Sequence, residues 1–255
     1  MRFASLGSGS QGNALLIESG GTRVLLDCGF GLSELTSRLA RLDLEAADLD
    51  AIIVTHEHGD HGSGVAKLAA HFDIAVYLTR GTLSALGAEG RSIPRKVLID
   101  PYTAIAIDGI EVSPFPVPHD AREPVQFVLS DGVVRLGVLT DTGRPTPHIA
   151  QALSGVDALV LECNHDPDML MNGPYPAQLK RRIAGGLGHL ANAASAELVR
   201  AMDCSRLQHL VAAHLSQTNN TPELARAALA GALGCAAEWI GIATQEDGFA
   251  WREIT

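Results

Sequence analysis

Residues 51–61 read Ala-Ile-Ile-Val-Thr-His-Glu-His-Gly-Asp-His, an apolar run that passes directly into three histidines and an aspartate. Such a run, followed by a polar segment that contains glycine, predicts a buried strand with ligands at its carboxyl end. Alternate side chains of an extended chain share a face, so His56 and His58 can bind one cation. Gly59 can turn the backbone and redirect Asp60 and His61. The stretch therefore predicts a loop with room for two adjacent metals, rather than a histidine-rich surface loop.

The ligand types indicate which metals the loop suits. Imidazole and carboxylate groups bind zinc at about 2.0–2.2 Å. Manganese and iron are alternatives, because the loop holds no thiolate that would select a soft metal. The cysteines are scattered without paired spacing, which predicts buried apolar side chains rather than a disulfide framework or a zinc knuckle. They are Cys28, Cys163, Cys204 and Cys235.

Composition points to one folded unit. The chain has 255 residues and 46% hydrophobic content, enough for a substantial core, and no low-complexity linker divides it. We therefore predict a single domain over residues 1–255. No span approaches about 18 uninterrupted apolar residues, and the amino terminus lacks the basic and apolar regions of a signal peptide. We expect a soluble, cytoplasmic protein that does not bind membranes.

The apolar pattern predicts strands towards both ends of the chain and helices between strands. Short strands at 3–6, 14–17 and 24–26 are joined by glycine-containing turns, which indicates an antiparallel opening. The remaining predicted strands are 51–54, 75–78, 110–115, 125–129, 133–139, 158–161, 207–212, 239–242 and 249–251. Helical spacing or capping predicts helices at 32–42, 65–69, 177–183, 193–202 and 222–229.

Three more candidate ligands follow apolar strands further along the chain. His119 comes after a strand that ends in Pro-Val-Pro, and the prolines stiffen the approach. Asp141 follows another strand, where its carboxylate can bridge two cations, and His214 follows a third. Taken alone, a strand-end His or Asp is more often a cap or a loop hydrogen-bonder than a ligand. Several strands that each end in a His or Asp are typical of a site built along one sheet edge.

In chain order these residues read His-x-His-x-Asp-His, then His, Asp and His, and this order resembles the metallo-β-lactamase fold superfamily. The resemblance covers essentially the whole chain. It implies an α/β (α+β) fold, a four-layer αββα sandwich in which two mixed β-sheets are flanked by helices. It also implies a dinuclear site whose first metal is held by His56, His58 and His119. Asp60, His61 and His214 would hold the second metal, and Asp141 would bridge the two.

The resemblance extends to one supporting residue and disfavours one activity. The segment Leu26-Asp27-Cys28-Gly29 is similar to the family's strand-ending Asp-x-Gly, which gives Asp27 a role beneath the ligands. β-Lactamases tend to carry Cys in the second metal site and lack this set with its bridging Asp. Hydrolysis of antibiotics is therefore disfavoured, whereas phosphodiesters, thioesters and lactones stay open as substrates.

Further segments are similar to the YycJ-type (WalJ) proteins, single-domain members described as exonucleases on DNA. They are 161–166, 173–176, 179–183, 188–192 and 214–220. The part from 188 to 216 also resembles ribonuclease Z, where a His after Gly acts near the scissile phosphate. His189 is therefore a candidate general acid or phosphate contact, with a capping or core histidine as the alternative. Ala191 stands where the family commonly has Ser, which removes one hydroxyl.

These resemblances imply a dinuclear metal-dependent hydrolase, a phosphodiesterase or an exonuclease with DNA as its substrate. Divalent metals lower the pKa of bound water towards about 7, and a hydroxide bridging them would attack phosphorus. Two such cations outweigh two carboxylates and one hydroxide, so the site favours an anionic substrate. The predicted catalytic residues are Asp60, Asp141 and His189. The predicted substrate-binding residues are Asn164, His165, Lys180, Arg181 and Asn192.

The net charge opposes nucleic-acid binding. It is −10, and only 4% of residues are aromatic, which leaves few platforms for stacking bases. The basic run at 180–182 either meets a phosphate backbone or forms a solvated helix face. Two alternatives therefore stay open. One is a hydrolase of small molecules, such as a cyclic or short phosphodiester, a lactone or a thioester, and the other is a noncatalytic regulatory protein that binds metal. The sequence leaves the oligomeric state open.

Overall fold

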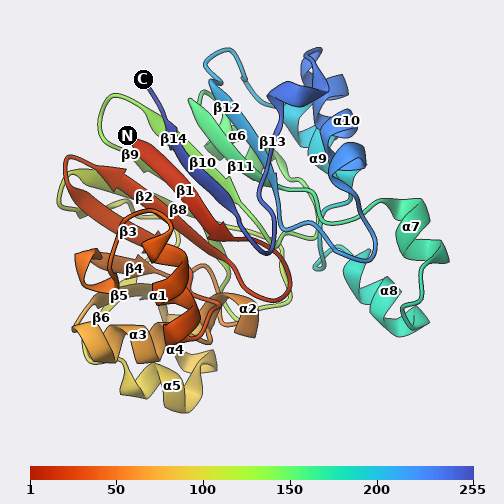
Figure 1. Cartoon of the computed structure of the whole chain (residues 1–255). Coiled ribbons are helices and arrows are strands. Elements are labelled where there is room, and N and C mark those ends of the chain that lie inside the picture. Colours follow the sequence, from red (N-terminus) through yellow and green to blue (C-terminus); the bar gives the residue numbers. More distant parts are fainter.

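The strands form two mixed β-sheets that pack face to face (Figure 1). A computed structural model describes all residues from 1 to 255. The order in the first sheet is β14 (Phe249–Glu253), β1 (Arg2–Gly7), β2 (Ala14–Ser19), β3 (Thr22–Leu26), β4 (Ala51–Ile53), β5 (Ala75–Thr79) and β6 (Lys96–Ile99). Strands β14 to β3 pair antiparallel, whereas β3 to β6 run parallel.

The second sheet mixes the two pairings in a similar way. Its order is β13 (Gly241–Ile242), β12 (His209–Ala213), β11 (Ala158–Glu162), β10 (Arg135–Leu139), β9 (Val125–Ser130), β8 (Ile110–Pro116) and β7 (Ile105–Ile107). Strands β13 to β10 run parallel, and β10 to β7 pair antiparallel. Because β8 and β10 are both antiparallel to β9, they share a direction with β11 and β12.

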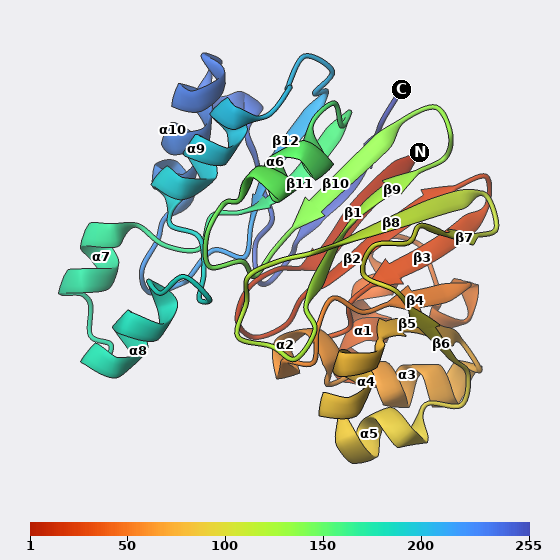
Figure 2. The same cartoon turned by 180° about the vertical axis from the view of Figure 1, so that it is seen from behind.

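Helices cover the outer faces of both sheets. On the first sheet lie α1 (Leu32–Ala40), α3 (Val65–Phe72), α4 (Arg80–Ala85) and α5 (Gly87–Ser92), and on the second lie α6 (Pro147–Leu153), α9 (Asn192–Ala201) and α10 (Pro222–Leu233). The view from behind shows α7 (Pro167–Asn172) and α8 (Ala177–Ile183) standing beside these layers (Figure 2). One-turn helices at α2 (Gly59–Gly62), Ala46–Asp48 and Ala237–Trp239 complete the chain. This arrangement confirms the predicted αββα sandwich.

Three apolar clusters hold the four layers together. The central cluster lies between the sheets and includes Phe3 and Ile17 from the first sheet and Phe127 from the second. A second cluster joins the first sheet to α1 and α3, and a third joins the second sheet to α6, α9 and α10. Strands buried on both faces read as nearly continuous apolar runs, which is why residues 51–54 carry so clear a signal. No helix of the chain combines the length and apolar character needed to cross a membrane.

Most predicted strands and helices are present with small shifts at their ends. The strand predicted at 239–242 is wrong in its first half, because Ala237–Trp239 forms a 3-10 turn and only Gly241–Ile242 pairs with β12. The short edge strands β6 and β7 and the helices α4 to α7 were not predicted from the sequence.

Candidate metal centre

The residues expected to bind metal lie where strands of both sheets end. Asp27 follows β3, the 55–61 loop follows β4 and His119 follows β8, while Asp141 and His214 follow β10 and β12. Parallel strands bring their carboxyl ends to the same edge of a sheet, and the two sheets pack with these edges adjacent. Topology therefore gathers side chains that are far apart in the sequence.

Strained backbone marks three of these strand ends. Asp27, Asp141 and His214 adopt positive φ angles of 61°, 48° and 53°. The left-handed region costs a non-glycine residue about 1–3 kcal/mol, and such residues cluster at functional sites. Here each one turns the chain sharply at a strand end, and its side chain contacts residues of the second ligand group.

His56, His58 and His119 form the first ligand group. His56 Nε2 lies 3.1 Å from His58 Nδ1, and His119 Nε2 lies 3.2 Å from the same atom. These three nitrogens therefore converge on one point. His56 is fully buried, whereas the side chain of His58 is 28% exposed and reaches the pocket.

Asp60, His61, Asp141 and His214 form the second ligand group. His61 Nε2 lies 2.9 Å from Asp141 Oδ2 and 3.5 Å from Asp60 Oδ2, and His214 Nε2 lies 3.4 Å from Asp60 Oδ2. Asp141 also lies 4.0 Å from His119 of the first group. All seven predicted ligands thus come together, with Asp141 between the two groups, and their metal binding stays a prediction.

Hydrogen bonds beneath the ligands fix which imidazole nitrogen faces inwards. Asp27 accepts from the Thr55 hydroxyl at 2.8 Å and from His61 Nδ1 at 2.7 Å. With its proton given to Asp27, the Thr55 oxygen accepts from His56 Nδ1 at 2.9 Å. His119 Nδ1 donates to the carbonyl of Gly188 at 3.1 Å. With metal bound, the outer nitrogen of each of these histidines would hold the proton, which leaves Nε2 free as a ligand.

The donor set of the second group fits a divalent cation. His214 Nε2 and Asp141 Oδ2 are buried and form no hydrogen bond of good geometry, although Asp60 Oδ2 lies 3.4 Å from the first atom and His61 Nε2 lies 2.9 Å from the second. A buried polar atom without a partner costs about 1–3 kcal/mol, so two of them in one cluster need an explanation. A cation bound by both atoms would satisfy them, and imidazole with carboxylate is a ligand set that zinc, manganese and iron accept.

The electrostatics of the cluster point the same way. Burial acts to raise the pKa of Asp141, but the charges of His214 and His61 outweigh it and hold this pKa well below its usual range. Burial acts to lower the pKa of His214, but Asp141 raises it to about 10. In the metal-free protein, imidazolium protons therefore balance the buried carboxylates, at the place where a cation would do so.

Glu162 lies in the segment 161–166, and the sequence did not predict its contacts with the site. It is fully buried at the end of β11, and its Oε1 accepts from His189 Nδ1 at 2.7 Å and from His214 Nδ1 at 3.3 Å. Burial acts to lower the pKa of His189, but the charge of Glu162 outweighs this and raises it. Glu162 thus ties His189 to a ligand of the second group. The sequence signal that could have identified Glu162 is an acidic residue at the end of an apolar strand.

Asn13 is a second residue that the sequence analysis missed. Its Nδ2 lies 3.2 Å from the carbonyl of Asp60 and 3.1 Å from His61 Nε2, and its Oδ1 accepts from Gly9 N at 2.9 Å. The glycine-rich loop between β1 and β2 therefore supports the second ligand group from the side. Ser8 of this loop accepts from the backbone N–H of His214 at 2.9 Å.

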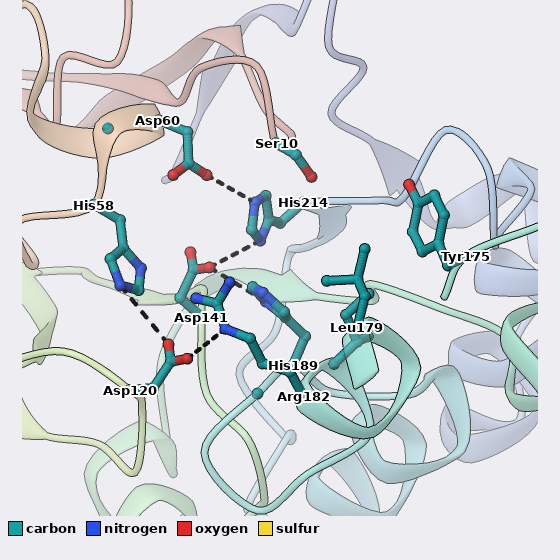
Figure 3. Close-up of a pocket in the computed structure, with 13 residues that line it drawn as sticks. Ser10, His58, Asp60, Asp120, Asp141, Tyr175, Leu179, Arg182, His189 and His214 are labelled. Atoms are coloured by element: carbon teal, nitrogen blue, oxygen red, sulfur yellow. Dashed lines mark hydrogen bonds and ion pairs between the residues drawn. The ribbon is translucent and has the colours of Figure 1, made fainter. Parts of the chain in front are cut away.

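A pocket of about 400 Å³ opens directly over both ligand groups. His58, Asp60, Asp141, His189 and His214 form its floor, and α8 forms one wall (Figure 3). Residues from the other sides include Ser10, Asp120 and Tyr175. The candidate metal centre is therefore accessible from solvent on the side that carries His189.

None of the five predicted substrate-binding residues lines this pocket. Asn164 is buried and donates to the carbonyl of His214 at 3.0 Å, and His165 packs beside it at 3.3 Å. Asn192 exchanges hydrogen bonds with Asn220 beneath the loop that carries His189. Lys180 donates to the carbonyl of Met171, and Arg181 is exposed. Contact of these residues with substrate stays a prediction.

The chain has relatives that match it over most of its length. A family model described as beta-lactamase superfamily domain matches residues 22–215. The chain is 34% identical over 228 residues to the exodeoxyribonuclease YycJ of Bacillus anthracis. This alignment covers 89% of this chain and 86% of that protein. It is 30% identical over 112 residues to the ribonuclease Z of Methanopyrus kandleri, 41% of this chain and 39% of that one. Both resemblances inferred from the sequence are confirmed.

A solved structure shows the same fold. The metallo-beta-lactamase fold protein YhfI from Bacillus subtilis superposes with a TM-score of 0.75, over 98% of each chain. The two sequences are only 16% identical, so this likeness concerns the fold alone.

Proposed function

Because the chain belongs to the beta-lactamase superfamily and is a metal-dependent hydrolase, we propose that it is a two-metal exonuclease that degrades DNA. One observation carries this proposal: the two ligand groups are adjacent, with Asp141 of the second group 4.0 Å from His119 of the first, on the floor of a single open pocket. A site with two adjacent cations suits phosphodiester cleavage, because both the attacking and the leaving oxygen can be stabilised. The relative named exodeoxyribonuclease supports the choice of substrate.

His56, His58 and His119 would hold one metal, Asp60, His61 and His214 the other, and Asp141 would contact both. When bound, the two cations would supply Lewis acidity towards phosphoryl oxygens and lower the pKa of water in the site. Zinc is our first choice, with manganese or iron as alternatives, because the ligands are all imidazole or carboxylate.

The chain's own residues would position the substrate and handle the proton. His189 lines the pocket and its Nδ1 donates to Glu162, while its Nε2 makes no hydrogen bond within the protein. A proton on that nitrogen is available to a leaving oxygen, with Glu162 holding the ring in place. Asp27 and Thr55 would keep the ligand imidazoles in the tautomers that bind metal.

A small-molecule phosphodiester is the second candidate substrate, and the lining of the pocket favours it. Asp60, Asp120 and Asp141 line the pocket with a single arginine, and the net charge of the chain is −10. A polyanion meets more repulsion at such a surface than a small diester does.

A single domain over residues 1–255 and a cytoplasmic location also stay predictions.

Cleavage assays with matched substrates test the proposal. Metal-loaded protein is incubated with end-labelled linear DNA, closed circular DNA, RNA of the same sequence and bis(4-nitrophenyl) phosphate. We expect mononucleotides from linear DNA and none from circular DNA, and we expect Asp141→Ala protein to lose this activity. Turnover of the small diester without any cleavage of DNA would support the second candidate instead. Activity that survives in folded Asp141→Ala would refute the metal mechanism.

A further inference from the structure

Helix α8 presents one face to the pocket. Leu179, Arg182 and Ile183 line the pocket, and their spacing of three and four residues places them on one side of the helix. Lys180 and Arg181 fall on other sides of the same helix, where they do not line the pocket. The basic run therefore contributes one residue, Arg182, to the pocket.

Arg182 is the only lysine or arginine in the pocket lining. Its Nε donates to Asp120 Oδ2 at 2.6 Å, and its side chain is 58% exposed. Its two Nη groups have no partner within the protein. A guanidinium fixed at one edge with both Nη groups free is arranged for a bidentate contact with a phosphate. Figure 3 shows the side chain extending from α8 across to Asp120.

Asp120 separates this guanidinium from the first ligand group. Its Oδ1 lies 3.7 Å from His58 Nε2 and 3.6 Å from His119 Nε2, while its Oδ2 holds Arg182. A carboxylate thus stands between Arg182 and the point on which the ligand nitrogens converge. The guanidinium therefore lies one carboxylate away from the first ligand group and lines the same pocket.

We propose that Arg182 binds the phosphate that neighbours the scissile one, with Asp120 as the residue that positions it. The inference rests on the proposed function and specifies its substrate class as a strand end with at least two phosphates. Leu179 and Tyr175 line the same pocket as Arg182 and offer an apolar and an aromatic surface to the terminal nucleoside. Asp120 also lowers the cost of ordering the arginine, because the guanidinium is already held before substrate binds.

Two short substrates isolate this contact. The dinucleotide TpT has one phosphate, whereas TpTpT has a flanking phosphate whichever end is attacked. The readout is the ratio of kcat/KM for TpTpT to kcat/KM for TpT, measured for the metal-loaded wild type and for Arg182→Gln. Arg200→Gln is the matched control, because Arg200 is exposed on α9 and its side chain makes no hydrogen bond or ion pair. Arg181→Gln tests the neighbouring residue of the same helix.

We expect Arg182→Gln to lower this ratio about 10- to 100-fold, the effect of losing a hydrogen bond between charged groups. Arg200→Gln should keep the wild-type ratio. On longer single strands, Arg182→Gln should also reduce the slope of log KM against log salt by about 0.7, the contribution of one phosphate contact. Arg182→Lys keeps the charge without the planar fork of the guanidinium. Its ratio of kcat/KM values should therefore fall between those of the wild type and Arg182→Gln. It also serves as the test variant if Arg182→Gln does not fold.

The outcomes separate this inference from the proposed function. Wild-type protein that cleaves TpTpT, combined with an unchanged ratio in Arg182→Gln and Arg182→Lys, would overturn the role of Arg182 alone. The same follows if Arg181→Gln lowers the ratio and Arg182→Gln does not. Wild-type protein that cleaves neither DNA nor either oligonucleotide, with two metals bound, would overturn the proposed function and this inference together.

Discussion

Substitution of Glu162 by Gln probes the support beneath the metal centre. The buried carboxylate accepts hydrogen bonds from the Nδ1 atoms of His189 and His214 and from the backbone N–H groups of Thr142 and Leu190. Gln has the same shape, but its amide nitrogen is a donor. Whichever way the amide is oriented, it faces N–H groups that have lost their acceptor.

The structure gives the size of the effect on stability and on metal binding. Removing one partner of a buried charged pair costs about 3–5 kcal/mol, so we expect the free energy of unfolding of the metal-free protein to fall by that amount. When the amide nitrogen faces the histidines, His214 loses the acceptor that orients it, which lowers the affinity for the second metal about 10- to 100-fold. His56, His58 and His119 make no hydrogen bond with Glu162, so the first metal should keep its affinity.

Urea denaturation and metal analysis measure the two effects separately. The protein is dialysed against a metal buffer that half-saturates the weaker wild-type site, and bound metal is then counted by mass spectrometry. Glu197→Gln is the control, because Glu197 is an exposed carboxylate on α9. Suppose that Glu162→Gln protein binds two metals with wild-type affinity and that its free energy of unfolding is within about 1 kcal/mol of wild type. Glu162 would then not support the second ligand group.

Three further substitutions test other parts of the structure. Asp27→Asn puts an N–H against His61 Nδ1, which at 2.7 Å now donates to the carboxylate, so we expect about one metal per chain in place of two; two tightly bound metals would contradict this. A Cβ on Gly29 would clash with the backbone carbonyl of Asp60, so Gly29→Ala should lower the melting temperature by several degrees and weaken metal binding, and an unchanged melt would count against the packing described. Burial acts to raise the pKa of Asp131, but backbone N–H groups outweigh it and lower this pKa to about 2. Because the folded pKa lies below the unfolded value of about 3.9, the stabilisation is present above pH 4 and is lost as the pH falls towards 2. Asp131→Asn should therefore cost about 1 kcal/mol in urea denaturation at pH 7 and less at pH 3, and a difference that stays constant with pH would contradict the assignment.

Local sequence signals predicted the buried strands and the ligands that follow them. Strands such as β4 and β11 are buried on both faces, so their apolar runs are unmistakable. The ligands His119, Asp141 and His214 could be found because each comes just after such a run. Pairing of the sheets then brings them together, and the family resemblance supplied that step.

The missed elements lack such signals. Strand β6 lies at a sheet edge, and its residues Lys96, Val97 and Leu98 are exposed, so no alternation marks it. Helices α4 and α5 are one to two turns long and contain glycines, which weakens any helical period.

The site residues that were missed act through three-dimensional contacts. Glu162 and Asn13 touch ligands that are distant in the chain, and no local spacing encodes those contacts. The choice of Lys180 and Arg181 over Arg182 reflects the same limit. The rotation of α8 against the pocket decides which of these three residues faces the substrate, and the sequence does not specify that rotation.

A metal titration of the metal-free protein shows whether cleavage of DNA needs both cations. Metal-free protein receives increasing equivalents of Mn²⁺ or Zn²⁺, and both the metal bound per chain and the release of nucleotides from end-labelled DNA are followed. The account predicts two bound metals per chain, with digestion that rises as the second equivalent binds. Full activity at one metal per chain, or no digestion of DNA at two, would contradict it.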